Sequence, residues 1–126
     1  MEDSDDPPSA VVSADDPLIN VCIEGWRFAR VYSRAISKLD ASEQTKYVGQ
    51  LRYFLKQLED NLKQVNVSLV NLEGHPFDPG LPISAINIGD FTDGERLVVD
   101  QMLEPVVMGP SGLIKMGRVL LKKVDP

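Results

Sequence analysis

The chain has 126 residues, which suits one compact domain with room for a small second unit. Hydrophobic residues make up 43% of it and charged residues 25%, so a core can form and a wholly disordered chain is excluded. Six of its 19 acidic residues lie before residue 17 with no Lys or Arg among them, and the other 13 are matched by 13 Lys and Arg. Because the body has no excess of positive charge, we expect no nucleic-acid partner.

The sequence also argues against a membrane or a secreted location. Its first residues, MEDSDDPPS, are acidic and proline-rich, the reverse of a secretory signal. No run approaches the ~18 consecutive apolar residues of a membrane-spanning helix. The single cysteine, Cys22, cannot form an internal disulfide and stands between two apolar residues, where a free thiol usually packs as a small hydrophobe. We therefore expect a cytoplasmic protein without a membrane partner.

The first half of the chain predicts a tail and two helices. Residues 1–16 combine Asp, Ser and Pro with few apolar side chains, which indicates a flexible acidic tail. Apolar residues then recur at every third or fourth position, the spacing that keeps one helix face apolar, and predict a helix over 17–39. Asp40 followed by Glu43 resembles a capping box at a helix start. A second apolar stripe predicts a helix over 41–64, antiparallel to the first because the link is short.

The second half predicts a β domain. After residue 66 the apolar period falls to two, which indicates a strand from Val67. The later apolar segments are short, β-branched and separated by Gly and Pro; they lie at 83–88, 97–102, 106–108 and 118–124. We expect an α+β fold, with an antiparallel helical hairpin over 17–66 that could form half of a dimeric four-helix bundle. A small, mostly antiparallel β domain is expected over 67–126.

Patterns for catalysis or metal binding are weak. His75, the sole histidine, has Glu73 and Asp78 nearby and could act as the general base of a small hydrolase, but no Ser or Cys lies at a recognisable spacing. A turn residue in Gly-His-Pro is the simpler interpretation. The acidic turn at 90–95 lacks the alternating ligands of an EF-hand, and the stretch at 109–115 lacks the Gly-Lys-Ser/Thr ending of a phosphate loop. We expect no enzyme activity, no metal and no cofactor.

Two sets of side chains on the helices admit a binding role. The first set is a basic face of the first helix, formed by Arg27, Arg30, Arg34 and Lys38. This basic face could dock an acidic partner or the acidic tail, or could be the solvated face of the helix. The second set is aromatic and consists of Trp26, Tyr32, Tyr47 and Phe54. At helical spacing these aromatic residues favour a core or a helix–helix interface over a ligand site.

Two segments carry a family resemblance. Residues 74–81, Gly-His-Pro-Phe-Asp-Pro-Gly-Leu, look like the segment that opens the β domain of GrpE, the nucleotide exchange factor of DnaK-type chaperones. Residues 112–120 resemble the family's pattern of Gly, an aromatic residue, three further residues and Gly-Arg-Val-Leu. The preceding helices are similar in length and placement to the short helices of the GrpE four-helix bundle. The resemblance covers about residues 20–124.

The resemblance implies a co-chaperone of protein folding and stress response. In GrpE a homodimer pairs through helices, and the β domain of one protomer opens the chaperone's nucleotide-binding cleft so that ADP leaves. By this likeness the contact with a DnaK-type chaperone would be formed by Phe77, Asp78, Pro79, Gly117 and Arg118, and the dimer interface by Trp26, Phe54 and Leu58. The loop 77–79 could equally be a packed turn, and Arg118 a solvated strand residue.

The chain departs from the family in several places. Only 16 acidic, proline-bearing residues precede the first predicted helix, so we expect no stalk function. Leu113 replaces the usual aromatic residue, Leu121 and Lys122 replace the usual Arg-Pro or Arg-Ala, and residues 103–111, with two prolines, look like an inserted loop. These departures favour an alternative, in which a GrpE-derived structural or adaptor protein has lost exchange activity and mediates protein–protein assembly through its helical hairpin.

Overall fold

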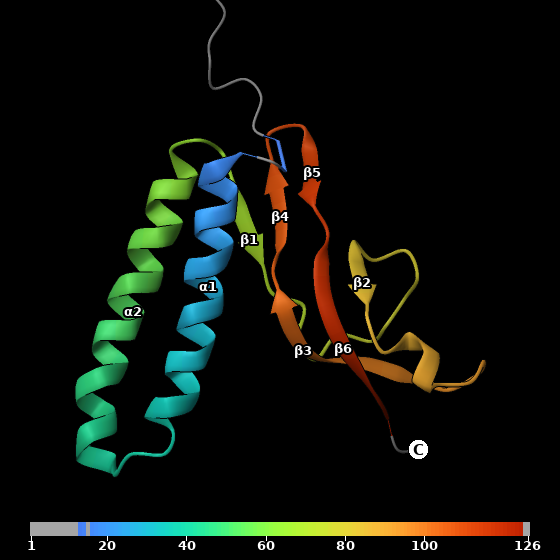
Figure 1. Ribbon diagram of the computed structural model, residues 1–126, viewed down its shortest axis with the longest axis horizontal. Coiled ribbons are helices and arrows are strands. Elements are labelled where there is room, and N and C mark those ends of the chain that lie inside the picture. The colour runs from blue at the N-terminus through green and yellow to red at the C-terminus, as the bar shows by residue number, and fades with distance from the viewer. Residues whose placement is uncertain (1–12, 15, 125–126) are drawn as a thin grey trace, which may run out of the picture. The chain divides into compact units, whose positions relative to one another are not determined.

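The computed structural model describes residues 13–14 and 16–124, which fall into two compact units divided after Ser68. The predicted tail at 1–16 lies almost wholly outside the described residues. The first unit is an antiparallel hairpin of α1 (Pro17–Ile36) and α2 (Ala41–Lys63), shown in blue and green in Figure 1. The helical hairpin is therefore as predicted. Neither helix in the described part of the chain is long and apolar enough to cross a membrane.

Helix α1 is capped at both ends by local hydrogen bonds. At its start, Leu18 N–H donates to Asp16 Oδ1 at 2.8 Å, which satisfies one of the unpaired N–H groups of a helix start. The predicted end at residue 39 is three residues too late. Leu39 N–H donates to the carbonyl oxygen of Ile36, three residues back, so the helical hydrogen-bond pattern ends in a tighter turn. Gln44 Nε2 donates to the carbonyl oxygens of Ser37 at 3.3 Å and Leu39 at 2.8 Å and satisfies them.

Helix α2 begins at the predicted cap. Asp40 Oδ1 accepts hydrogen bonds from Glu43 N–H at 3.0 Å and from the Ser42 hydroxyl at 2.9 Å. The carboxylate therefore caps the first turn, with Ser42 as an additional partner. At the other end, Asn66 adopts a φ of 58°, a left-handed conformation that Asn tolerates better than most residues, and the chain turns there into β1.

The second unit contains two three-stranded sheets. Its strands are β1 (Ser68–Val70), β2 (Ile83–Ala85), β3 (Leu97–Glu104), β4 (Val106–Gly109), β5 (Gly112–Lys115) and β6 (Gly117–Lys123). The strand orders are β1-β4-β5 and β2-β6-β3. The β3–β6 and β4–β5 pairs are antiparallel, whereas β2 and β6 are parallel. Two helices followed by small, antiparallel-rich sheets confirm the predicted α+β fold class (Figure 1).

Two expectations for the β unit are wrong. The strand expected over 83–88 stops at Ala85, and the chain enters the short 3-10 helix η2 (Ile88–Asp90). Residues 103–111 are not an inserted loop, because they complete β3 and form all of β4. Pro105 fits because it stands between the two strands, where no ladder hydrogen bond requires its missing N–H, and it is fully buried.

The core of the β unit comes from alternating positions on its strands. On β6, Val119 and Leu121 are buried, whereas Arg118 and Lys122 are exposed, as period two requires. The other buried apolar residues of the β unit are Ile83, Val99, Met102, Val106 and Val107. Because β6 pairs on both edges, its outward residues lie at the centre of the β2-β6-β3 sheet rather than at its border.

Candidate functional site

The first segment that resembles GrpE, residues 74–81, runs beside β3. Gly74 N–H donates to Val99 O at 2.9 Å, and Phe77 N–H donates to Leu97 O at 2.8 Å. Gly74 has a φ of 86°, in the region that favours glycine. Phe77 is half-buried. These bonds fix the backbone of the segment up to its aromatic residue.

The turn that follows Phe77 is closed by Asp78. Gly80 N–H donates to Asp78 Oδ1 and Leu81 N–H donates to Asp78 O, both at 2.9 Å. A side chain that bonds the backbone two residues ahead stabilises a turn, and Pro79 restricts it further. Asp78 and Pro79 are both exposed. The segment therefore exposes an ordered polar turn directly after the half-buried side chain of Phe77.

Gly117, in the second resembling segment, lies beside the two residues that directly follow the first segment. In the parallel β2–β6 pair, Gly117 stands opposite Ile83, and Gly117 N–H donates to Pro82 O at 3.0 Å. Gly117 is buried, and a Cβ added there would lie 3.0 Å from both Met102 Cε and Val106 Cγ2. Glycine is needed here for close packing, so any effect of Gly117 on partner binding would act through the position of β6.

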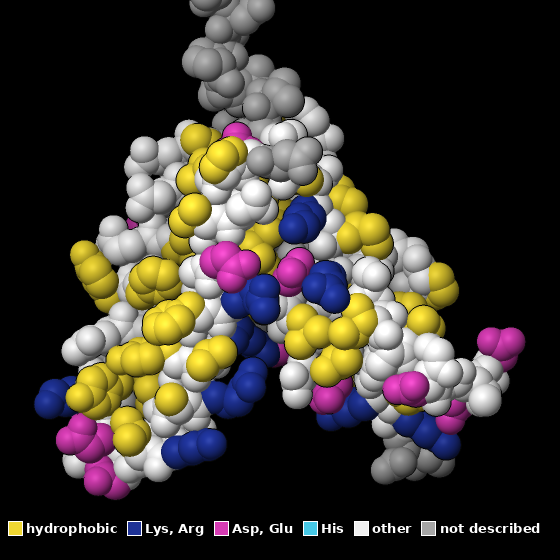
Figure 2. Space-filling view, viewed as in Figure 1, with side chains coloured by type: hydrophobic (Ala, Val, Ile, Leu, Met, Phe, Trp, Pro, Cys, Tyr) yellow, Lys and Arg dark blue, Asp and Glu magenta, His cyan; other side chains and the backbone are white. Residues whose placement is uncertain are grey.

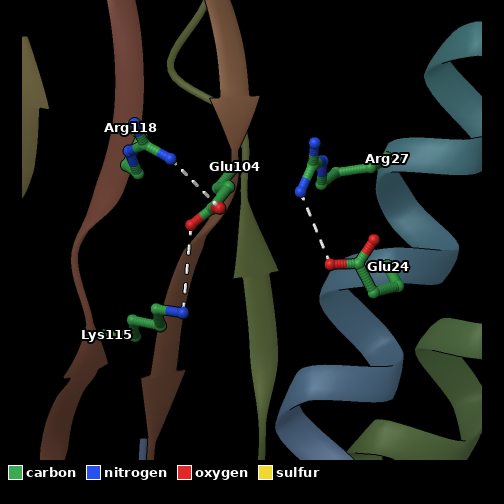
Figure 3. A network of polar contacts seen from close by, with 5 residues as sticks. All are labelled: Glu24, Arg27, Glu104, Lys115 and Arg118. Atoms are coloured by element: carbon green, nitrogen blue, oxygen red, sulfur yellow. Dashed lines mark hydrogen bonds and ion pairs between the residues drawn. The ribbon is translucent and has the colours of Figure 1, made fainter. Parts of the chain in front are cut away.

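Arg118 belongs to a charged group, the Glu104 cluster, formed by Glu104, Lys115 and Arg118 (Figure 3). Arg118 Nη1 lies 3.5 Å from Glu104 Oε2, and Lys115 Nζ lies 3.9 Å from Glu104 Oε1. The Glu104 side chain is 13% exposed and that of Arg118 is 51% exposed. Half-exposed pairs of this kind contribute about 0–1 kcal/mol. The carboxylate thus orients the guanidinium and leaves half of its surface accessible.

The three residues expected at a dimer interface differ in burial. Trp26 is buried, and the Arg30 guanidinium lies over its ring, 5.2 Å from the centroid. Phe54 is 42% exposed, although its ring approaches α1 so closely that a Cβ at Gly25 would lie 3.3 Å from it. Leu58 is half-buried. The core position expected for the aromatic residues therefore holds for Trp26, whereas Phe54 lies at the edge of the helix contact.

A groove runs between the two helices of the hairpin. This hairpin groove has a volume of about 200 Å³ and is lined by Phe28, Ala29, Tyr32, Gln50, Leu51 and Phe54. The rings of Phe28 and Tyr32 stack at 6.2 Å, and Phe28 is 66% exposed. Hydrophobic side chains gather over both helices on the face shown in Figure 2. The hairpin thus leaves apolar surface uncovered within its own unit.

His75 lies on the surface of the β unit. Of the two acids near it in sequence, Glu73 Oε2 accepts a hydrogen bond from Met102 N–H at 2.9 Å, and Asp78 accepts from its own turn. Within the described ranges, no group of three or more His, Cys, Asp or Glu residues could hold a metal ion.

The acidic turn at 90–95 uses Glu95 for its own structure. Glu95 Oε1 accepts from Thr92 N–H at 2.8 Å, and Glu95 Oε2 lies 3.2 Å from Lys123 Nζ. The Thr92 hydrogen bond, followed by that of Lys123, lowers the pKa of Glu95. This carboxylate therefore ties the turn to the end of β6.

Comparison with known proteins gives no relative. No family model, curated protein or solved structure matches this chain. The likeness to the GrpE family therefore rests on the segments at 74–81 and 112–120 and on the helices before them.

Glu104 and Phe28 are not among the site residues predicted from the sequence. Glu104 follows a shift in the β3–β6 register after Met102, so simple alternation along β3 does not assign its face. Phe28 stands four residues before Tyr32, a spacing that places both on one side of a helix. The spacing of Phe28 and Tyr32 in the sequence therefore indicates a second apolar face on α1.

Proposed function

We propose that this chain is a GrpE-like co-chaperone, which binds the nucleotide-binding domain of a DnaK-type chaperone and promotes ADP release. One observation supports this proposal most: Gly117 N–H, in the second resembling segment, donates to the carbonyl oxygen of Pro82, the residue that directly follows the first segment, so the two segments, distant in sequence, lie near each other. The sheet that joins them leaves the Asp78 turn and the Arg118 side chain exposed. An ordered turn and an oriented guanidinium are suited to contact a partner surface.

Binding alone carries the proposed mechanism. An exchange factor that binds the open state of a nucleotide cleft more tightly than the closed state shifts the chaperone toward the open state, from which ADP leaves. Phe77 would contribute apolar area at the base of the contact, and Arg118 would pair with a carboxylate of the chaperone. This role needs no bond-making residue in the chain.

We further propose that the hairpin pairs with a second copy. The hairpin groove exposes aromatic surface, and the apolar stripe of α2, which includes Leu51, Leu55 and Leu58, is only half-buried in the single chain. Contiguous apolar patches of this kind are uncommon on monomers. Two hairpins packed through these faces would bury the patches in a four-helix bundle.

The alternative is an adaptor that keeps this fold without exchange activity. The hairpin groove favours it, because an uncovered apolar face can join a larger assembly whether or not the β unit contacts a chaperone.

Release of a fluorescent ADP analogue from the DnaK-type chaperone of the same organism tests the proposal by stopped flow. We expect the chain to accelerate release. Arg118→Ala should raise the concentration needed for half of the effect by about 30-fold, as for loss of a central arginine contact worth about 2 kcal/mol. Lys123→Ala is the matched control, since Lys123 lies on the same strand, is 58% exposed and also pairs with a carboxylate.

Each outcome of this experiment tests one part of the proposal. No acceleration at concentrations far above that of the chaperone would exclude exchange activity and leave the adaptor. If Arg118→Ala and Lys123→Ala weaken the acceleration equally, Arg118 has no specific role in the contact. Arg118→Lys, which keeps the charge but not the planar set of donors, should lie between the parent and Arg118→Ala.

A further inference from the structure

The basic face of α1 has no part in the proposed exchange activity. Arg27 Nη1 lies 3.4 Å from Glu24 Oε2 on the same helix (Figure 3), and Arg30 lies over the Trp26 ring. Arg34 in the last turn of α1 and Lys38, two residues beyond its end, are exposed, and neither side chain forms an ion pair with any residue that the structure describes. Two cations four residues apart, one in the last turn of α1 and one in the turn that follows it, are therefore open to an anionic group.

The complementary charge lies in the same chain. Residues 1–12 contain Glu2, Asp3, Asp5 and Asp6 and no Lys or Arg, while residues 17–126 carry as many bases as acids. The N-terminal segment thus carries a block of negative charge without bases, whereas residues 27–38 carry four bases without an acid. The two blocks have opposite sign and attract each other at long range.

The chain can reach this surface. Asp16 N–H donates to Ser13 O at 3.0 Å, so a turn precedes α1. Arg34 lies about 26 Å from Pro17 along the axis, at ~1.5 Å per residue. An extended chain from Ser13 spans about 23 Å to Asp6 and about 36 Å to Glu2, at ~3.3 Å per residue. The chain between Ser13 and the four acids is therefore long enough to reach Arg34.

We propose that the acidic segment, residues 2–6, docks on Arg34 and Lys38 and covers the basic face of α1. Single exposed ion pairs are weak, but the tether holds the acids near the face at an effective concentration on the order of millimolar, so several weak pairs suffice. An anionic partner of α1 must then displace this segment. Because the pairs are exposed, salt weakens the docking.

Paramagnetic relaxation in the full chain tests this docking. A nitroxide attached through Ser4→Cys should broaden the amide signals of Arg34 and Lys38 at low ionic strength. Cys22 is buried, and burial raises the pKa of its thiol, so the label reacts preferentially at residue 4. We expect the broadening to be lost in Arg34→Gln/Lys38→Gln, in a variant with Glu2, Asp3, Asp5 and Asp6 changed to amides, and at high salt.

Controls separate docking from general charge effects. Changing Asp90 and Asp93 to Asn, or Lys122 to Gln, alters exposed charges elsewhere and should leave the broadening unchanged. Equal broadening in the parent and in Arg34→Gln/Lys38→Gln, or none on α1 in the parent, overturns the proposal. Spin-labelled chains mixed with isotope-labelled chains report contacts between copies; broadening confined to such mixtures overturns docking within one chain. None of these results depends on exchange activity.

Discussion

At the scale of single residues, Asn87 shows how a side chain replaces a strand. The parallel β2–β6 pairing ends at Ala85, yet Asn87 Nδ2 donates to Leu121 O and Asn87 Oδ1 accepts from Leu121 N–H, both at 2.9 Å. The side-chain amide thus pairs with β6 where the backbone has turned away. Alternation of apolar residues does not reveal such a contact, because it depends on the conformation of residues 86–88.

We predict that Asn87→Ala lowers the free energy of unfolding by about 2 kcal/mol, because the part-buried N–H and C=O of Leu121 lose their partners. Asn20→Ala, at an exposed position of α1, is the control and should change stability by less than about 0.5 kcal/mol. Urea denaturation measures both. An Asn87→Ala variant as stable as the control would show that water replaces the amide at no cost.

At the scale of elements, the helices were predictable and the strands less so. A helix repeats its apolar period over many residues, and Asp40 marks the start of α2, so both helices were placed within three residues. Strands β2 and β5 are three and four residues long, too short for period two to define their ends. Residues 103–111 were assigned to a loop because prolines suggest breaks; here Pro105 joins two strands.

The cap of α2 gives a pH-dependent prediction. Hydrogen bonds from Glu43 N–H and then from Ser42 lower the pKa of Asp40 below its ordinary value of 3.8. The ionised carboxylate therefore stabilises the fold fully above that pH, and the stabilisation is lost as pH falls through the lower pKa of the folded state.

Asp40→Ala should lower the Tm by a few degrees near neutral pH, and the difference from the parent should shrink below about pH 4. Melting followed by far-ultraviolet circular dichroism measures it, with Asp93→Ala at an exposed loop position as the control. A gap between Asp40→Ala and the parent that widens on acidification would contradict the role of the carboxylate.

At the scale of the whole molecule, the sequence predicted the fold class and the hairpin but not which apolar side chains stay uncovered. An apolar stripe on a helix is compatible both with packing inside one hairpin and with packing between two copies in a dimer. The Glu104 cluster was also missed, because its three members come from three strands whose register includes bulges. Contacts between strands depend on pairing, which a single sequence does not record.

The proposed bundle predicts a dimer by light scattering at micromolar concentration. Phe28→Glu should raise the Kd by about 100-fold, since a buried aromatic contact is replaced by a charge. Phe28 is 66% exposed in the single chain, so its replacement leaves no cavity. Tyr53→Glu is the matched control, because Tyr53 is 67% exposed on α2 and does not line the hairpin groove. A monomeric parent, or equal loss in both variants, would refute the bundle.

The central position of β6 bears on how the chain is made. β2 and β3 do not pair with each other. Each of them pairs with β6, the last of the described strands in sequence. During synthesis on the ribosome, the hairpin can form once α2 has emerged, while the two outer strands still expose unpaired edges. A nascent chain cut short before β6 would carry a finished hairpin and an open half-sheet, which is prone to aggregate and open to proteases.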